Sequence, residues 1–525
     1  MRRSTLVTKR EAEALTVKKI NQAFHSEMRH GRRSVPGTTT LSLIGMILAL
    51  WFCTPVYGGG FEIADQGGEV AGRAGASTAK VDDVTAIEYN PAGLTKIQGT
   101  QFYIGNRFTY SNEEFRRART LDWSDAVHGI PKLESFDTAR NQTPFQILGT
   151  MFGAASNFGL KDWAFAVGVY GPSGTASQKF DAEGPQRYQL IKRDVLILYY
   201  NFSLAWKYND LFGIGASLQW VDLNKMEFEL AIDGNVTPGI VNPVSSDFDM
   251  RIRIKGADHV GFSGILGFWV RPLPCLELAV SSRLIPVRMN AKSKLSVTPF
   301  ELDPTQAKAT ITKNGKPDNN VTFSMNLPIK LRAGLRYIYM EGDKERFDLE
   351  LDFGYESWSM MKNYTLNGGG RMVSVLGNEL SIDKIVIDKN WKDTYSLRLG
   401  GDVSVVPGWF ALRGGFFYES PSAAKEYSYV DFFSSHRFGP SVGFSVDFFG
   451  VNISAAYTYT FQMPVVVTEE KSKVYQQTPG SLCKEPYTDA SVCSEYYLGR
   501  PGAPVNAGTY TSDYHFVTAN VSYTF

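Results

Sequence analysis

Hydrophobic and polar side chains alternate along much of this chain. At its C-terminal end Val517, Ala519, Val521, Tyr523 and Phe525 alternate with Thr518, Asn520, Ser522 and Thr524. Residues 438–448 and 451–462 repeat the pattern, and only Phe449 and Gly450 separate them. A period of two is typical of β-strands whose two faces differ. The two segments are therefore predicted to form a tight hairpin.

Applied to the whole chain, the pattern predicts fourteen strands. They lie near residues 101–110, 145–154, 163–171, 194–207, 212–223, 251–270, 276–291, 321–339, 346–359, 394–405, 409–419, 435–448, 451–463 and 513–525. Tight turns alternate with long polar loops, as in outer-membrane barrels. A secreted β-sandwich would have a polar outer face, whereas here aromatic side chains oppose small polar and charged ones. The predicted fold is an all-β membrane protein, a 14-stranded antiparallel transmembrane β-barrel with both ends on the periplasmic side.

The first 58 residues differ from the rest. They hold nine Lys and Arg against three Glu, and an apolar run of thirteen residues, 41–53, follows the basic part. This run is shorter than the roughly 20 residues that a membrane-spanning helix needs, and the small residues Val56 and Gly58 come next. The order predicts a signal peptide over residues 1–58. We predict that translation starts at Met28 rather than Met1, because this would give the peptide a basic region of ordinary length.

Residues 59–100 lack the two-residue period and are rich in Gly and Ala. Such a segment could stay in the periplasm or fold into the lumen, and its small side chains favour the crowded lumen. The predicted organisation is thus a signal peptide (1–58), an N-terminal hatch or plug (59–100) and a transmembrane barrel (101–525).

Composition excludes one class of partner. The chain has 54 Lys and Arg against 53 Asp and Glu, a formal net charge of +1, so no nucleic-acid partner is expected. The 13% aromatic residues are expected to form a lipid-facing belt on the barrel.

Several motifs are similar to a known family. Gly72-Arg73-Ala74, Asp82-Asp83 and Tyr89-Asn90-Pro91-Ala92-Gly93 resemble the hatch of the FadL family of outer-membrane transporters for long-chain fatty acids and aromatic hydrocarbons. Weaker matches extend the resemblance over residues 59–525: Gly168-Val-Tyr-Gly-Pro172, Gly184-Pro-Gln-Arg-Tyr188, Asn326-Leu-Pro328, Tyr355-Glu-Ser-Trp358 and Tyr523-Thr-Phe525. The resemblance implies capture in a hydrophobic groove among the loops and lateral release beside a kinked third strand. It places Gly168 and Gly171 in that strand and the gate residues Asn90, Pro91 and Ala92 near the exit.

A fatty-acid carboxylate would need a basic partner near the loop ends of the strands. The candidates are Arg187, Lys192, Arg193 and Lys225. Each is equally compatible with a solvated surface position, and Asp194 and Asp222 lie close by in the sequence. Neutral aromatic hydrocarbons therefore stay open as alternative substrates.

Two consecutive predicted strands carry opposite charges on their polar sides. Lys330, Arg332 and Arg336 lie on one strand, and Asp348, Glu350, Asp352 and Glu356 on the next. We interpret them as a structural ladder that ties the wall to the hatch; a proton relay or a carboxylate site is the alternative.

The remaining motifs add little chemistry. Cys483 and Cys493, ten residues apart in the last long loop, are predicted to form a disulfide in the oxidising envelope, which leaves Cys275 alone. The hydrolase-like segment 439–443 contains Ser441 but lies in a strand, and His436 beside it is interpreted as an ordinary strand residue. No enzyme activity, cofactor or metal site is predicted.

The sequence thus favours a multi-pass protein of the bacterial outer membrane that transports hydrophobic small molecules, with long-chain fatty acids as the first choice. A surface adhesin or phage receptor is the alternative that the long loops allow, and an open porin is disfavoured by the hatch. The expected partners are outer-membrane lipid, lipopolysaccharide and the barrel-assembly machinery, and the protein is expected to be a monomer.

Overall fold

The computed structural model describes residues 60, 65–122, 132–171, 177–233, 246, 249–300, 309–375, 378–476 and 504–525, and the structural statements below concern these residues. They belong to one compact unit. The predicted signal peptide and the predicted disulfide between Cys483 and Cys493 lie outside the described residues. Within the described part of the chain, no helix is both long and apolar enough to cross a membrane.

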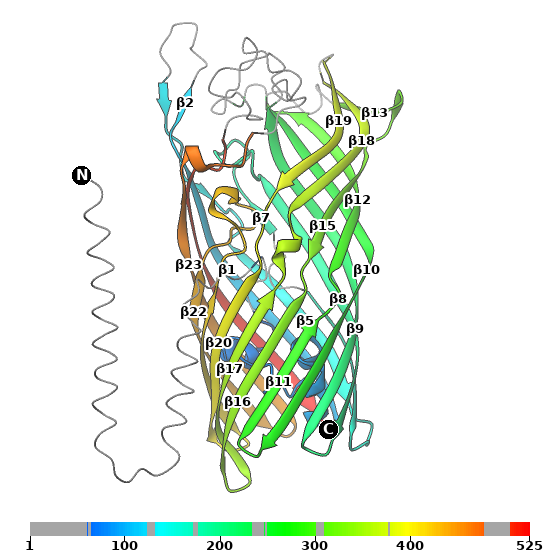
Figure 1. Cartoon of the computed structure of the whole chain (residues 1–525), viewed down its shortest axis with the longest axis vertical. Helices are drawn as coiled ribbons and strands as arrows, with labels where there is room; N and C mark the ends of the chain where they lie inside the picture. Colours follow the sequence, from blue (N-terminus) through cyan, green and yellow to red (C-terminus); the bar gives the residue numbers. More distant parts are fainter. Residues whose placement is uncertain are drawn as a thin grey trace, which may run out of the picture. The chain divides into compact units, whose positions relative to one another are not determined.

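One antiparallel sheet closes on itself to form a barrel with fourteen membrane strands (Figure 1), as predicted. Several of these membrane strands consist of two segments that follow each other in the chain and pair with the same neighbouring strand. The segments are β1 (Thr100–Arg117), β4 (Ala139–Arg140), β5 (Phe145–Ser156), β6 (Trp163–Tyr170), β7 (Ser177–Lys179), β8 (Lys192–Tyr208), β9 (Phe212–Asp233), β10 (Asp249–Leu273), β11 (Leu276–Arg283), β12 (Val287–Pro299), β15 (Asn320–Leu327), β16 (Lys330–Glu341), β17 (Lys344–Glu356), β18 (Asn363–Val375), β19 (Asn378–Asp388), β20 (Thr394–Val406), β21 (Phe410–Glu419), β22 (Arg437–Phe448), β23 (Val451–Val467) and β24 (Gly508–Thr524). The barrel closes where β1 pairs with β24, from Gln101↔Thr524 to Arg117↔Gly508.

The wall is more segmented than the sequence pattern predicted. The predicted strand 321–339 consists of β15 and β16, and β18 and β19 form a hairpin in the stretch 360–393, which was expected to be a loop. Three consecutive glycines at 368–370 interrupt the alternation, and the pairing of β18 with β19 shifts register between Asn367 and Arg371. Two small hairpins, β2 (Thr120–Asp122) with β3 (Lys132–Glu134) and β13 (Thr310–Lys313) with β14 (Lys316–Pro317), decorate the loop end.

The half of the barrel that carries the tight turns has an apolar outside and a polar inside. Leu335, Leu351 and Leu412 are 45%, 46% and 47% exposed on the outer face. On the same strands Glu350 and Arg336 face inwards and are buried. This arrangement is that of a wall with lipid outside and polar groups in its lumen.

The two faces exchange character in the half that carries the long loops. The inward positions of β9, β10, β12, β15 and β18 there are apolar and buried. Phe228 and Phe323 stack with ring centroids 5.3 Å apart although their strands are not neighbours, and Tyr364 lies 5.5 Å from Phe323. Two register shifts between Gly256 and Gly261 separate the two halves, the first with one extra residue in β9 and the second with one extra residue in β10. The single extra residue in β10 places Arg251, Arg253 and Lys255 on the outer face, whereas an unbroken alternation from the turn end would place them on the inner face.

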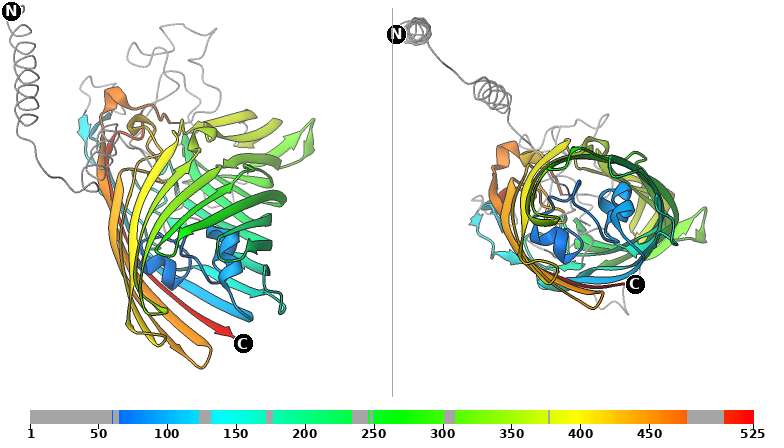
Figure 2. Two further views of the ribbon diagram at one scale, coloured as in Figure 1. Left: turned by 60° about the horizontal axis from the view of Figure 1, so that its bottom comes forward. Right: turned by 90° about the horizontal axis from the view of Figure 1, so that it is seen from below.

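Residues 65–99 lie inside the ring of strands (Figure 2). They form α3 (Gly68–Gly72), α4 (Ala86–Tyr89) and the 3₁₀ helix η1 (Pro91–Lys96). Asn90 begins η1 as its cap, because its side-chain oxygen accepts a hydrogen bond from the Ala92 amide at 3.2 Å, and Pro91 suits the first helical position. We call residues 65–99 the hatch below.

Candidate functional site: the hatch and the loop-end lumen

Arg73 is the central ionic contact between the hatch and the wall. Its guanidinium is buried, and Nη1 lies 2.6 Å from Asp348 Oδ1 and 2.7 Å from Asp402 Oδ1. Nη2 lies 3.1 Å from Glu350 Oε2. The three carboxylates come from β17 and β20, so one hatch side chain bridges two strands of the wall.

The acidic residues of β17 also bind the hatch backbone. Asp352 Oδ2 accepts hydrogen bonds from the amides of Ser77 and Thr78 at 3.0 and 2.9 Å. Glu350 Oε1 accepts one from the Ala79 amide at 2.7 Å. Buried amides need such partners, and β17 supplies carboxylates in a row because its alternate positions share one face.

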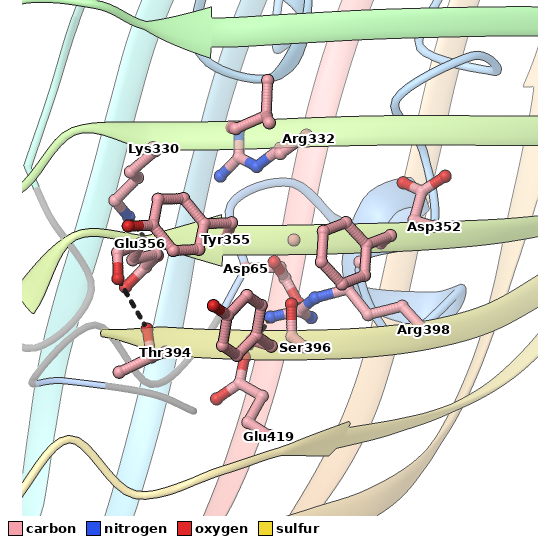
Figure 3. A pocket seen from close by; sticks show the side chains of 15 residues that line it. Asp65, Lys330, Arg332, Asp352, Tyr355, Glu356, Thr394, Ser396, Arg398 and Glu419 are labelled. Atoms are coloured by element: carbon pink, nitrogen blue, oxygen red, sulfur yellow. Dashed lines mark hydrogen bonds and ion pairs between the residues drawn. The ribbon is translucent and has the colours of Figure 1, made fainter. Parts of the chain in front are cut away.

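The basic members of the predicted ladder face the same region. Lys330 pairs with Glu356 across the strands at 3.0 Å, and Arg336 Nε lies 2.5 Å from Asp348 Oδ2. Arg332 donates to the carbonyl of Glu88 in the hatch at 3.0 Å. Figure 3 shows the polar pocket at this point, which Arg332 and Arg398 of the wall and Asp65 of the hatch line; Arg398 Nη1 lies 2.9 Å from Asp65 Oδ2.

Opposed glycine pairs in the wall form the surfaces on which the hatch packs. Gly400 is opposite Gly415, Gly215 is opposite Gly267, and Gly153 is opposite Gly168. A Cβ at Gly415 would come within 2.4 Å of the Arg73 backbone, one at Gly215 within 2.4 Å of Pro91 and Ala92, and one at Gly168 within 2.4 Å of Ile87. Only a wall without side chains allows the hatch to lie this close.

The third membrane strand is short and only partly paired. β6 pairs with β5 from Phe152↔Val169 to Ser156↔Phe165, and the described residues contain no β6 partner for the rest of β5. An apolar hollow opens here on the lipid-facing side, lined by residues of β1, β5, β6, β8 and β24 including Phe152 and Gly168. On the inside, the hatch residue Gln66 donates to the carbonyl of Gly171 at 2.7 Å.

The predicted gate residues do not all meet at β6. Asn90 donates to the carbonyl of Phe268 in β10 at 3.2 Å, and Trp269 donates to the carbonyl of Ala92 at 3.0 Å. The box Asn90, Pro91 and Ala92 therefore packs on β9 and β10, on the far side of β8 from β6. Val84 and Ile87 are the hatch side chains against Gly153 and Gly168, because α4 precedes the box in the chain.

The four candidate carboxylate partners divide between the two faces of the wall. Lys192 and Lys225 lie on the outer face, paired with Glu227 at 3.2 Å and Asp194 at 2.5 Å. Arg187 and Arg193 are buried inside. Arg187 is bound to Asp249 at 2.6 Å and to the Tyr188 hydroxyl at 3.0 Å.

Arg193 meets a second buried cation in the loop-end lumen. Its Nη1 donates to the carbonyl of Asp431, and its guanidinium carbon lies 4.0 Å from the centroid of the Phe432 ring. Lys389 Nζ lies 2.6 Å from Asp431 Oδ2 and 3.6 Å from the centroid of the Tyr429 ring. Burial lowers the pKa of Lys389, and the neighbouring Arg193 acts in the same direction. Arg193 Nε is buried without a hydrogen-bond partner among the described residues.

Sequence reasoning identified Arg193 but missed Lys389 and Asp431. Lys389 follows β19, and Asp431 lies in the segment between β21 and β22. Neither residue stands in a motif, and about 200 residues of chain separate Arg193 from Lys389, so only the tertiary structure brings them together.

The residues that matched enzyme formulas have structural contacts. Ser441 donates to the carbonyl of Ala71 in the hatch, and His436 Nδ1 lies 2.8 Å from the Tyr418 hydroxyl. In the part of the chain that the structure describes, no group of three or more His, Cys, Asp or Glu side chains is arranged to hold a metal ion.

A family model confirms the resemblance seen in the motifs. The model described as outer membrane protein transport protein (OMPP1/FadL/TodX) matches residues 50–496. The chain belongs to this family. It is therefore a β-barrel protein of the bacterial outer membrane, and the family transports hydrophobic compounds. Among the curated proteins, none matches this chain.

Solved structures show the same fold. A FadL homologue of Pseudomonas aeruginosa superposes with a TM-score of 0.68 at 16% identity, covering 89% of this chain and 100% of that chain. The Pseudomonas putida toluene transporter TodX has a TM-score of 0.57 at 14% identity, covering 90% and 100%. The Ralstonia pickettii toluene transporter TbuX has a TM-score of 0.54 at 13% identity, covering 89% and 100%.

Proposed function

We propose that this FadL-family protein takes up long-chain fatty acids, and that Arg193 and Lys389 bind the substrate carboxylate. The observation that carries the proposal is the approach of two buried cations to one residue, Asp431, in the apolar part of the lumen: Lys389 pairs with its carboxylate, and Arg193 donates to its backbone carbonyl. A fatty acid needs both features, because its chain gains about 0.8 kcal/mol for each buried methylene and its headgroup needs charged donors.

Asp431 occupies the place that the substrate carboxylate would take. In the proposed bound state the fatty-acid carboxylate replaces Asp431 against Lys389 and uses the free donor Nε of Arg193. The exchange keeps the number of buried charges constant, which avoids the cost of an unpaired buried cation.

Release follows the family's lateral route in this proposal. The hollow over β1, β5, β6, β8 and β24 is apolar and faces lipid, and Gln66, Val84 and Ile87 of the hatch contact the inner side of the wall at β5, β6 and Gly171. A solute that leaves here does not cross the charged contacts between Arg73 and β17.

Uptake of labelled oleate and toluene by a strain that lacks its own transporters tests the substrate. Lys389→Met should lower oleate binding and uptake about ten- to hundredfold, the equivalent of ~1.5–3 kcal/mol for a charge-assisted hydrogen bond. Toluene uptake should not change, since a neutral ring needs no cation. The control is Lys392→Met, at an exposed lysine three residues away. If Lys389→Met lowers oleate and toluene uptake equally, or lowers neither, the fatty-acid proposal is rejected. If Arg193→Gln lowers toluene uptake alone, the aromatic-hydrocarbon alternative is favoured.

A further inference from the structure

The outer surface of the loop-end half carries a belt of cations directly beyond the apolar band. We call it the basic belt; its members, on the outward positions of β8, β9, β10 and β12, are Lys192, Lys225, Arg251, Arg253, Lys255, Arg288, Lys292 and Lys294. Below it, the exposed apolar side chains of the same strands and their junctions begin with Trp220, Val260, Phe262, Leu284 and Ile285. The change occurs at the register shifts between β9 and β10, within a few residues.

The acids near one side of the belt are fewer than the cations that they serve. Glu227 is shared by Lys192, Arg253 and Lys255 at 3.2, 3.6 and 3.5 Å. Glu229 is shared by Arg251 and Arg253 at 3.3 and 2.7 Å. Their positive charge is therefore only partly compensated within the protein.

On the other side of the belt the cations have no acidic partner among the described residues. Arg288, Lys292 and Lys294 project from β12, whose neighbour β15 offers them only the uncharged residues Asn326, Thr322 and Asn320. Lys294 stands directly opposite Lys255 across the strands. Directly opposed like charges destabilise a strand pair, and no described carboxylate lies within ion-pair distance of Arg288, Lys292 or Lys294.

We propose that the basic belt on β10 and β12 is a binding site for lipopolysaccharide, with the phosphates of its glucosamine headgroup between Lys255, Lys292 and Lys294. The belt lies at the loop end of the apolar band, which is the level of the headgroups in the outer leaflet of the outer membrane. The acyl chains of the same molecule then lie on Val260, Phe262, Leu284 and Ile285. A ligand with two phosphates joined to several chains matches both surfaces at once, and its phosphates relieve the repulsion between Lys255 and Lys294.

The proposal is separate from fatty-acid transport. The belt faces outwards, whereas Arg193 and Lys389 lie inside the lumen. Lipid binding is therefore measured without reference to uptake.

The test measures binding of fluorescent lipid A to the purified full-length barrel in detergent. In the double variant Lys292→Gln/Lys294→Gln we expect the affinity to fall at least tenfold. The wild-type barrel should bind dephosphorylated lipid A as weakly as this variant binds lipid A. The matched control Lys161→Gln/Lys344→Gln changes two exposed lysines at the turn end and should bind like the wild type.

A second readout separates binding from folding. Without lipid A, the double variant should keep or raise the thermal midpoint of the barrel, because it removes the repulsion at Lys255. With lipid A, only the wild type and the control should gain stability. Unchanged lipid A affinity in the double variant, equal loss in the control, or full binding of the dephosphorylated lipid would each overturn the proposal.

Discussion

At the scale of single residues, buried charges make the specific contacts of this protein. Arg73 forms ion pairs with Asp348, Glu350 and Asp402, and Lys389 pairs with Asp431. A buried ion pair adds little net stability, but removal of one partner leaves the other uncompensated. Replacement of any of these side chains should therefore change stability or binding far more than replacement of a surface charge.

Arg73→Met should loosen the hatch while the barrel stays intact. Three buried carboxylates lose the cation that they share, although Asp348 keeps Arg336 and Asp402 keeps Arg413. The cost is about 3–5 kcal/mol, whereas the wall keeps its strand pairing. We expect faster amide hydrogen exchange over residues 70–80 and higher conductance of the protein in planar bilayers. Lys344→Met, which changes an exposed turn residue, is the control. Exchange and conductance equal to those of the wild type would show that Arg73 does not hold the hatch.

Carboxylate binding should depend on the charge of Lys389. Because burial lowers the pKa of Lys389, the side chain loses its proton at lower pH than an ordinary lysine, whose pKa is about 10.4. Oleate stays ionised as the pH rises, whereas Lys389 loses its charge. Oleate binding should therefore weaken at a pH below the pKa of an ordinary lysine. In the Lys389→Arg variant binding should persist, since a guanidinium stays charged. Titration of oleate binding from about pH 7 to pH 10 checks this, and identical profiles for the two proteins would contradict it.

At the scale of elements, the inner wall and the hatch are fitted to each other by glycines. The three opposed pairs on β20–β21, β9–β10 and β5–β6 lie under three different parts of the hatch. Strand propensity alone disfavours glycine at such positions, so their place in the wall follows from the close approach of the hatch backbone.

Two neighbouring glycines of β21 offer a matched test of this fit. Gly415 faces the hatch, whereas a Cβ at Gly414 would meet nothing within 4 Å. Gly415→Val should displace residues 73–74, raise bilayer conductance and reduce oleate uptake several-fold. Gly414→Val should leave both quantities near the wild-type values and favour the strand. If the two variants behave alike, the glycines serve the strand and not the hatch.

At the scale of the whole molecule, the barrel consists of two halves with opposite faces. The turn end is apolar outside and polar inside, whereas at the loop end β10 and β12 are charged outside and the inward positions of β9, β10, β12, β15 and β18 are apolar. A hydrophobic solute that enters from the loops therefore meets an apolar lumen first, and the charged contacts of the hatch lie beyond it. This division agrees with lateral release near β6 rather than passage through the full length of the lumen.

The strand number, the antiparallel closure and the family follow from local properties of the chain. A two-residue period runs through most of the wall, apart from the register shifts in β9, β10 and β18, because lipid and lumen require different side chains at successive positions. The family motif Tyr89–Gly93 is contiguous and is therefore also visible in the sequence. The charged stripe on β17 is likewise visible in the sequence, since Asp348, Glu350 and Asp352 are spaced two apart.

Tertiary structure alone decided which faces the charges of the loop end occupy and which residues meet. The one extra residue in β10 reverses the inward parity of the strand, and a strict alternation carried through it would assign Arg251 and Arg253 to the lumen. The pairing of Lys389 with Asp431, and their approach to Arg193, joins three distant segments of the chain. Periodicity is a local property that sequence records directly, whereas register shifts and long-range charge pairs depend on how the closed sheet places its strands.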